Sequence, residues 1–229
     1  MREKWKNFNQ GKFKYWWTVL YFPLYLMAFA YLEARGSGYE YSATMLIDYK
    51  IPFVEWFIFP YLMWFPYIAV AFILFFFKDK EEFLKLIRFL YVGMSAFIVT
   101  SFIFPNGLNL RPYVLEDHNI ATWLVAKLYA CDTATNVFPS IHVYNSIAVA
   151  VAFCKSRRVV TRNYVKVGSV VLSTAIVLST MFLKQHSVVD VAGAFILAVP
   201  VYHAVYGVAS GEHFEMFNHR KKKWSSANT

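Results

Sequence analysis

Long apolar stretches alternate with short polar or basic segments along this chain of 229 residues. A bilayer core about 30 Å thick is crossed by about 20 residues of α-helix, and six stretches reach or approach that length. The fourth is the shortest, because a basic segment ends it early. The six are Tyr15–Leu32, Phe53–Phe77, Leu84–Phe104, Ile141–Cys154, Tyr164–Leu183 and Ser187–Val208. The pattern predicts an all-α fold in the form of an integral membrane bundle of six helices.

The connections between these stretches differ in charge. Most of the 23 Lys and Arg residues lie before the first stretch, after the last, and in the second and fourth connections. In membrane proteins the cytoplasmic segments carry the excess of Lys and Arg. The bias therefore predicts that both termini are cytoplasmic and that the first, third and fifth connections lie outside. We interpret the net charge of +9 as this topological signal, and expect no nucleic-acid partner.

The composition supports a membrane protein over other classes. Hydrophobic residues make up 58% of the chain and charged residues only 16%, whereas soluble domains carry about 25% charged residues. Cys131 and Cys154 fall on opposite faces of the predicted layout, too far apart to form a disulfide within one chain. We expect one membrane domain, with an interfacial segment at 1–14, the helices at 15–208 and a basic tail at 209–229. The sequence does not determine the oligomeric state.

The first apolar stretch has two interpretations. Ala28-Phe29-Ala30 is compatible with the cleavage site of a secretory signal peptide. However, the apolar run is long for a signal peptide, and Trp16 and Trp17 flank it as interfacial anchors do. This combination favours an uncleaved membrane helix that belongs to the bundle.

Polar residues near the outer helix ends form three sets. Arg111 follows the third stretch, and its planar guanidinium suits a phosphate or a carboxylate. Ser140 and His142 open the fourth, where free N–H groups favour an anion and an imidazole can give or take a proton. His186 and Asp190 open the sixth, and at this spacing the carboxylate can orient the imidazole, leaving its other nitrogen free to attack. Each set alone is also compatible with a structural role.

Together the sets form the ordered pattern Arg-Pro, Pro-Ser-x-His and His-x-x-x-Asp. This pattern, over residues 104–193, resembles the type-2 phosphatidic acid phosphatase and vanadium haloperoxidase superfamily. The resemblance implies that His186 is the nucleophile that forms a phosphohistidine and that Asp190 orients it. It also implies that His142 protonates the leaving oxygen, while Arg111 and Ser140 hold the phosphoryl oxygens. No metal or other cofactor is implied for phosphate transfer.

The chain departs from the phosphatase pattern at two cationic positions. The lysine expected seven residues before the Arg-Pro arginine is Phe104, and the arginine expected six residues before the nucleophile is Thr180. Lys184 is our candidate for a replacement phosphate-binding cation, although an unbroken helix would point it away from His186. Lys127 is a weaker candidate, because a solvated loop face explains it better.

The resemblance implies a phosphatase that hydrolyses a lipid phosphomonoester or diphosphate at the outer face of the plasma membrane. The phosphate group of such a lipid lies at the membrane surface, where the three polar sets are predicted to lie. Two alternatives stay open. The stretch from Ser179 to Asp190 is also similar to the inositol phosphorylceramide synthase branch, which transfers a phosphorylated headgroup to a lipid hydroxyl. The missing cations are also compatible with a lipid-phosphate binder that has no catalytic activity.

Overall fold

The computed structural model describes residues 15–35, 41–112, 115 and 119–207. The predicted interfacial segment at 1–14 and the basic tail at 209–229 lie outside these residues. The described chain is mostly helical, as the apolar pattern predicts. Its elements are η1 (Trp16–Leu20), α2 (Tyr21–Ala34), β1 (Tyr41–Ser42), η2 (Leu46–Tyr49), η3 (Glu55–Phe57), α3 (Ile58–Leu62), α4 (Trp64–Lys78), α5 (Lys80–Ile103), β2 (Asn106–Gly107), α6 (Ile120–Cys131), α7 (Ile141–Lys155), α8 (Asn163–Phe182), α9 (Val188–Tyr202) and η4 (His203–Gly207).

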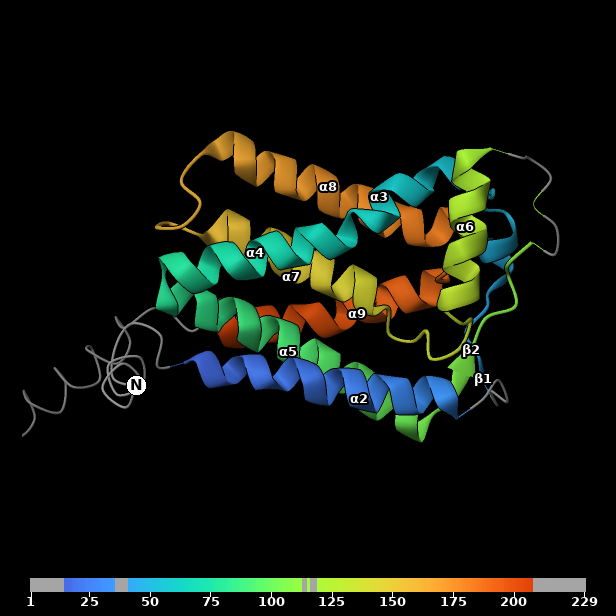
Figure 1. Ribbon diagram of the computed structural model, residues 1–229, viewed down its shortest axis with the longest axis horizontal. Coiled ribbons are helices and arrows are strands. Elements are labelled where there is room, and N and C mark those ends of the chain that lie inside the picture. Colours follow the sequence, from blue (N-terminus) through green and yellow to red (C-terminus); the bar gives the residue numbers. More distant parts are fainter. Residues whose placement is uncertain (1–14, 36–40, 113–114, 116–118, 208–229) are drawn as a thin grey trace, which may run out of the picture.

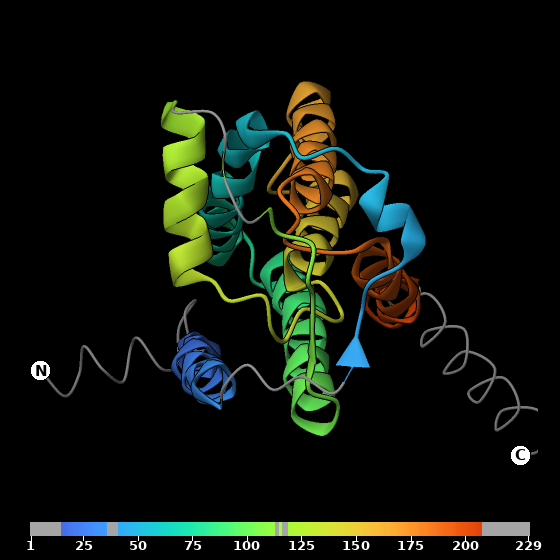
Figure 2. The same cartoon turned by 90° about the vertical axis from the view of Figure 1, so that its right-hand side faces the viewer.

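The helices lie along one axis, with their connections at the two ends (Figure 1). At one end, which we call the α6 end, α6 crosses the other helices and packs beside α3 (Figure 2). The connections before α3, between α5 and α7, and between α8 and α9 lie at this end, and the α4–α5 and α7–α8 turns lie at the other. The connections therefore alternate as the charge pattern predicts. Which end faces the cytoplasm is a prediction from charge.

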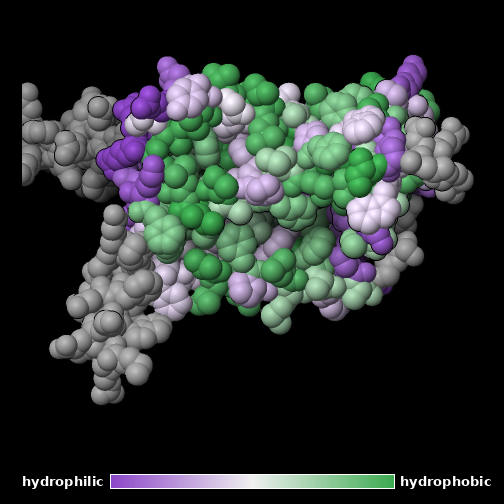
Figure 3. All heavy atoms as spheres, turned by 45° about the horizontal axis from the view of Figure 1, so that its top comes forward, coloured by the Kyte–Doolittle hydropathy of each residue, from purple (hydrophilic) through white to green (hydrophobic). Residues whose placement is uncertain are grey.

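Five helical segments of the described chain are long and apolar enough to cross a membrane, as expected of a multi-pass membrane protein. They are Trp16–Ala34, Glu55–Lys78, Lys80–Ile103, Asn163–Phe182 and Val188–Gly207. Figure 3 shows apolar side chains over the middle of one face and hydrophilic ones toward its ends. The predicted fourth crossing corresponds to α7, which has only 15 residues and is shorter than these segments. Whether α7 also crosses the membrane therefore stays a prediction.

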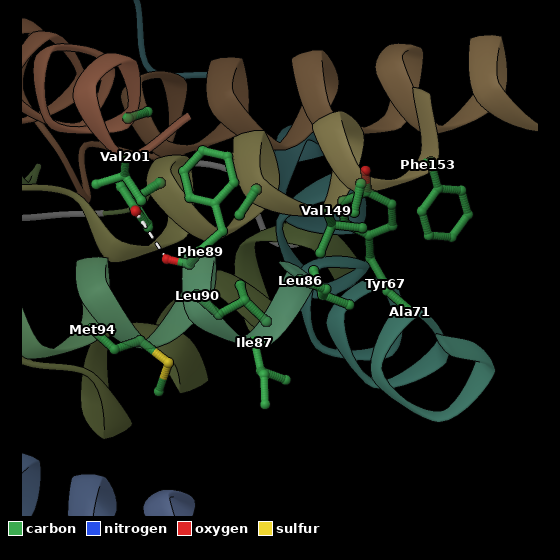
Figure 4. Packing of buried hydrophobic residues seen from close by; sticks show 14 of the residues in the cluster. Tyr67, Ala71, Leu86, Ile87, Phe89, Leu90, Met94, Val149, Phe153 and Val201 are labelled. Carbon is green, nitrogen blue, oxygen red and sulfur yellow. Dashed lines mark hydrogen bonds between the residues drawn. The ribbon is translucent and has the colours of Figure 1, made fainter. Parts of the chain in front are cut away.

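The short helix α7 is the centre of the bundle. Helices α4, α5, α8 and α9 pack around it, and most of its side chains are buried. Phe89 and Leu90 of α5 belong to the same core as Val149 of α7 (Figure 4). The ring of Tyr144 occupies the space where a Cβ on Gly93 of α5 would lie. The absence of a side chain at Gly93 thus lets α5 approach α7 closely at this level.

The second stretch is not one regular helix. The pattern predicts one helix over Phe53–Phe77, whereas η3 and α3 precede α4, with Met63 between the two α-helices. Pro66 has no N–H to donate to the carbonyl one turn earlier, which weakens the helix at this point. The Met63 carbonyl accepts the N–H of Tyr67 at 3.0 Å, so the direction of the chain is largely maintained. The break separates the short helix α3, at the α6 end, from the long apolar helix α4.

The connections at the α6 end are tied to one another. Strands β1 and β2 pair in parallel, with Tyr41 opposite Asn106. The side-chain oxygen of Asn106 accepts the N–H groups of Val137 and Phe138 at 2.8 and 2.9 Å. These bonds hold the segment that leads into α7 against the end of α5. The start of α7 is therefore positioned by residues from distant parts of the chain.

Candidate functional site

The turn between α8 and α9 carries the predicted nucleophile. Helix α8 ends at Phe182, and Lys184 then adopts a left-handed conformation with φ of 54°. The Thr180 carbonyl accepts the N–H groups of Gln185 and His186 at 2.9 and 3.0 Å. These bonds close the turn onto the last turn of α8 and fix the backbone of His186 there.

The predicted contact between His186 and Asp190 is present, although the two residues do not share a helix. Ser187 is the N-cap of α9, so His186 precedes the helix. Asp190 Oδ2 accepts the Ser187 N–H at 2.8 Å and lies 3.4 Å from His186 Nδ1. That approach is within ion-pair range but falls short of a hydrogen bond, since Nδ1 has no hydrogen-bond partner among the described residues. Both side chains are buried.

His142 faces His186 from the start of α7. Its Nδ1 lies 3.4 Å from His186 Nε2, at the long end of the hydrogen-bond range. Ser140 is the N-cap of α7, where its hydroxyl oxygen accepts the Val143 N–H at 3.3 Å. The Ser140 N–H donates to the Asp190 carbonyl at 3.1 Å, which ties the beginnings of α7 and α9 together. The structure therefore brings together the three residues predicted to be catalytic.

The other side of His142 contacts residues that sequence reasoning missed. Its Nε2 lies 3.1 Å from the hydroxyl of Tyr61, a buried residue of α3. The Tyr61 hydroxyl also lies 3.2 Å from Asp132 Oδ2, just after α6. The Trp64 ring lies against His142, with ring centroids 4.5 Å apart. The only sequence signal for Tyr61 was a hydroxyl inside an apolar stretch, and its partners come from distant segments.

Arg111 lies beside this group and is largely committed to neighbouring oxygens. Its guanidinium donates to the carbonyls of Asp132 and Thr133 at 2.8 and 3.0 Å, and to the side chain of Gln185. It also stacks over the Tyr129 ring, 4.4 Å from its centroid. Burial lowers the pKa of the Arg111 guanidinium, and burial raises the pKa of Asp132. Arg111 therefore connects the end of α6 to the turn that carries His186.

Three buried N–H donors around the histidines have no hydrogen-bond partner among the described residues. They are Arg111 Nε, Gln185 Nε2 and Trp64 Nε1. A buried polar group without a partner costs about 1–3 kcal/mol, so such groups are uncommon unless a ligand or water satisfies them. Donors of this kind fit the oxygens of an anion. Gln185 is a second residue that the sequence analysis did not single out, although it precedes the predicted nucleophile.

Lys184 binds a different set of oxygens. Its ammonium donates to the Asp48 carbonyl at 2.7 Å and to the Ile51 carbonyl, both in the connection that follows β1. Asp48 also accepts the Val188 N–H at 2.8 Å. Burial lowers the pKa of the Lys184 ammonium. Because α8 ends before Lys184, its side chain extends away from the histidine pair. Lys184 therefore links the connection after β1 to the turn between α8 and α9.

The chain departs from the phosphatase pattern at Phe104 and Thr180, and neither of these residues is a cation. Phe104 follows α5 and is half-exposed, with its ring against Tyr41. Thr180 is buried, and its hydroxyl donates to the Val177 carbonyl at 2.8 Å. Lys127 is exposed on α6, 5.7 Å above the centre of the Trp123 ring.

Within the described residues, no group of three or more His, Cys, Asp or Glu side chains is arranged to hold a metal ion.

Comparison with models of known protein families, with curated proteins and with solved structures finds no match to this chain. The geometry around His142 and His186 is therefore the basis for any functional conclusion.

Proposed function

We propose that this chain is an integral membrane phosphatase that hydrolyses lipid phosphates through a phosphohistidine. The observation that carries the proposal is the row formed by the buried side chains of Asp190 and His186 and the partly buried side chain of His142, with 3.4 Å between successive groups. A carboxylate behind one imidazole and a second imidazole in front of it are the groups needed for nucleophilic attack and proton transfer.

In the first step, the lone pair of His186 Nε2 attacks phosphorus. The phosphorus–nitrogen bond forms while the bond from phosphorus to the lipid oxygen breaks, and His142 gives that oxygen a proton. Water then attacks the phosphohistidine, the phosphorus–nitrogen bond breaks, and His142 accepts a proton from the water. Inorganic phosphate leaves and both imidazoles regain their starting state. The two nitrogens are 3.4 Å apart, so the rings must separate to admit the phosphoryl group.

The charge that develops on the phosphoryl oxygens needs donors that are already in position. Arg111 Nε, Gln185 Nε2 and Trp64 Nε1 are buried donors without partners among the described residues, and they supply three such groups. The first N–H groups of α7, at Ile141 and His142, have no carbonyl within the helix and add to this set. These donors compensate in part for the cations that the chain lacks at Phe104 and Thr180.

The substrate class follows from where the site lies in the bundle. His186 lies between the candidate spans Asn163–Phe182 and Val188–Gly207, and His142 lies at the start of α7, both at the α6 end of an apolar bundle. We infer that the α6 end faces outward, since the basic segments belong to the opposite end. A phosphate attached to a lipid in the outer leaflet of the plasma membrane would meet the site at this depth.

A second candidate is the transfer of a phosphorylated headgroup to an alcohol. It is favoured by Phe104 and Thr180, where the phosphatase pattern has cations, because neither position contributes charge to the site. Hydrolysis and transfer share the covalent intermediate and differ in whether water or an alcohol attacks it. An alcohol acceptor that increases turnover and appears in the product would identify a transferase.

The test is phosphate release by the purified, detergent-solubilised protein from phosphatidate, phosphatidylglycerol phosphate, polyprenyl diphosphate and sphingoid phosphates. We expect His186→Ala to abolish release, whereas His203→Ala, which alters an exposed histidine in η4, retains it. Orthovanadate should inhibit the wild-type protein by binding beside His186. Undiminished release by a folded His186→Ala variant would refute the proposal. Binding of lipid phosphates without any release or transfer would identify a non-catalytic binder.

A further inference from the structure

The histidine pair is the first of three contacts in a row, and the other two continue from His142 away from the phosphoryl site. They join His186 Nε2 to His142 Nδ1, His142 Nε2 to the Tyr61 hydroxyl, and that hydroxyl to Asp132 Oδ2, at 3.4, 3.1 and 3.2 Å. The row links the end of α8 to α7, α3 and the end of α6. Tyr61 is buried, so its only hydroxyl proton serves either His142 or Asp132, but not both.

The proton on Tyr61 determines what His142 can do. When Asp132 is ionised, Tyr61 donates to it, His142 places its proton on Nε2, and the bare Nδ1 faces His186. In that state His142 is a base toward the site. When Asp132 carries a proton, it donates to Tyr61, Tyr61 donates to His142 Nε2, and the His142 proton lies on Nδ1. In that state His142 is an acid toward the site.

The proposed reaction needs both states in sequence. The first step requires an acid that protonates the leaving oxygen, and the second requires a base that accepts a proton from water. We propose that Tyr61 and Asp132 form a proton relay behind His142, in which Asp132 supplies the proton for the first step and recovers it in the second. The inference rests on the proposed phosphatase activity, and it makes Tyr61 and Asp132 positioning residues, because neither touches the phosphoryl group.

The protons balance over one turnover. As His142 Nδ1 loses its proton to the lipid oxygen, His142 Nε2 takes the Tyr61 proton and Tyr61 takes the Asp132 proton. Asp132 is then ionised and His142 is ready as a base. When water attacks phosphorus, its proton goes to Nδ1, and the other two protons return along the same bonds to Tyr61 and Asp132.

The surroundings of Asp132 suit a carboxyl that changes its protonation state. Burial raises the pKa of Asp132, and the nearby charge of Glu33 acts in the same direction, while His186 and Arg111 oppose it. Arg111 donates to the backbone carbonyl of Asp132 at 2.8 Å. The carboxyl therefore has a proton acceptor, Tyr61, on one side and a fixed backbone on the other.

The test uses the dependence of the rate on the leaving group. Loss of the general acid slows the reaction strongly when the leaving group is an alkyl alcohol, which must be protonated as it departs. The loss is smaller with an activated aryl group, which can leave without a proton. We expect Tyr61→Phe and Asp132→Asn each to lower kcat for a short-chain phosphatidate about 10- to 100-fold, part of the roughly 10²–10⁴-fold that a positioned acid contributes. The loss with para-nitrophenyl phosphate should be at least about tenfold smaller. The double variant should lose no more than the worse single variant, because both act through one row.

Tyr67→Phe is the matched control. Tyr67 is also a buried tyrosine of the same helical segment, but its hydroxyl contacts the hydroxyl of Ser169 at 2.7 Å, away from the site. Its removal should leave the ratio of the two rates unchanged. Equal losses with both substrates for Tyr61→Phe and Asp132→Asn, in folded protein, would overturn the relay. If His186→Ala abolishes turnover in the same experiment, the phosphatase proposal stands even though the relay fails; if His186→Ala retains turnover, both fail.

Discussion

Asp190 belongs to α9 and His186 does not, yet Asp190 Oδ2 lies 3.4 Å from His186 Nδ1. The aspartate occupies the third position of the helix, where its carboxylate also accepts the Ser187 N–H at 2.8 Å. The same carboxylate thus closes the start of α9 and lies beside the imidazole. A helix-capping interaction and the proposed orientation of a nucleophile are combined in one side chain.

This double use of Asp190 leads to a prediction that separates capping from catalysis. Asp190→Asn keeps an oxygen for the Ser187 N–H but removes the charge beside His186, so we expect phosphate release to fall about 10²- to 10⁴-fold. Ser187→Ala removes the N-cap hydroxyl that accepts the Asp190 N–H, so it should cost about 1 kcal/mol of stability while retaining most of the activity. Phosphate release and thermal unfolding of both variants provide the measurement. An active Asp190→Asn variant would contradict the orienting role.

We expect Lys184 to contribute to the stability of the protein rather than to phosphate binding. Lys184→Met keeps a side chain of similar length in the left-handed conformation but leaves the Asp48 and Ile51 carbonyls without the ammonium. We expect a loss of about 1–3 kcal/mol in unfolding free energy. The KM for a lipid phosphate should stay close to that of the wild-type protein. Lys127→Met, at an exposed position of α6, is the control. A KM that rises in Lys184→Met at unchanged stability would instead support the phosphate-binding role predicted from the sequence.

The close approach of α5 and α7 can be tested with two glycines. A methyl group on Gly93 would collide with the Tyr144 ring, whereas one on Gly168 of α8 meets nothing within 4 Å. Gly93→Ala should therefore lower the stability by about 1–3 kcal/mol through overpacking, while Gly168→Ala should be neutral or stabilising by up to about 1 kcal/mol. Thermal unfolding in detergent distinguishes the two. Equal effects of the two substitutions would show that the ring moves aside.

The turn before α5 should make stability depend on pH. Asp79 is the N-cap of α5; burial alone would raise its pKa, but the Glu82 N–H and Arg158 donate to the carboxylate and lower that pKa below the usual 3.8. A carboxyl with a lowered pKa in the folded state stabilises the protein above its unfolded pKa, and this contribution is lost as the pH falls through the folded pKa. We therefore expect the unfolding temperature to fall in acid.

Asp79→Asn tests that dependence. Asparagine caps a helix about as well as aspartate, so stability near neutral pH should change little while part of the acid-induced fall disappears. Glu81→Gln is the control, because the Glu81 carboxylate is exposed and pairs with Lys85 and Arg158 at the surface. A wild-type protein and an Asp79→Asn variant with identical pH profiles would contradict the prediction.

Much of the fold could be predicted because a membrane imposes a simple rule. Apolar runs of sufficient length must be helices, since a helix satisfies its own backbone hydrogen bonds in lipid. Five segments of that kind are present, and when α7 is included with them the connections alternate between the two ends. The bounds of α7 also match the short fourth stretch that the sequence predicts, whereas its position at the centre of the other helices depends on packing. The break before α4 and the crossing helix α6 likewise depend on packing.

For the site, the residues at the starts of the helices could be predicted from the order of residues along the chain. His142 and His186 follow turn residues at the beginnings of apolar stretches, and the four-residue spacing to Asp190 predicts its contact with His186. Three contacts could not be predicted in this way: the two histidines face each other, Lys184 binds backbone carbonyls, and Tyr61 bridges His142 and Asp132. Local spacing follows from backbone geometry, which neighbours in sequence share, whereas contacts across 44 or 81 residues depend on how separate helices pack.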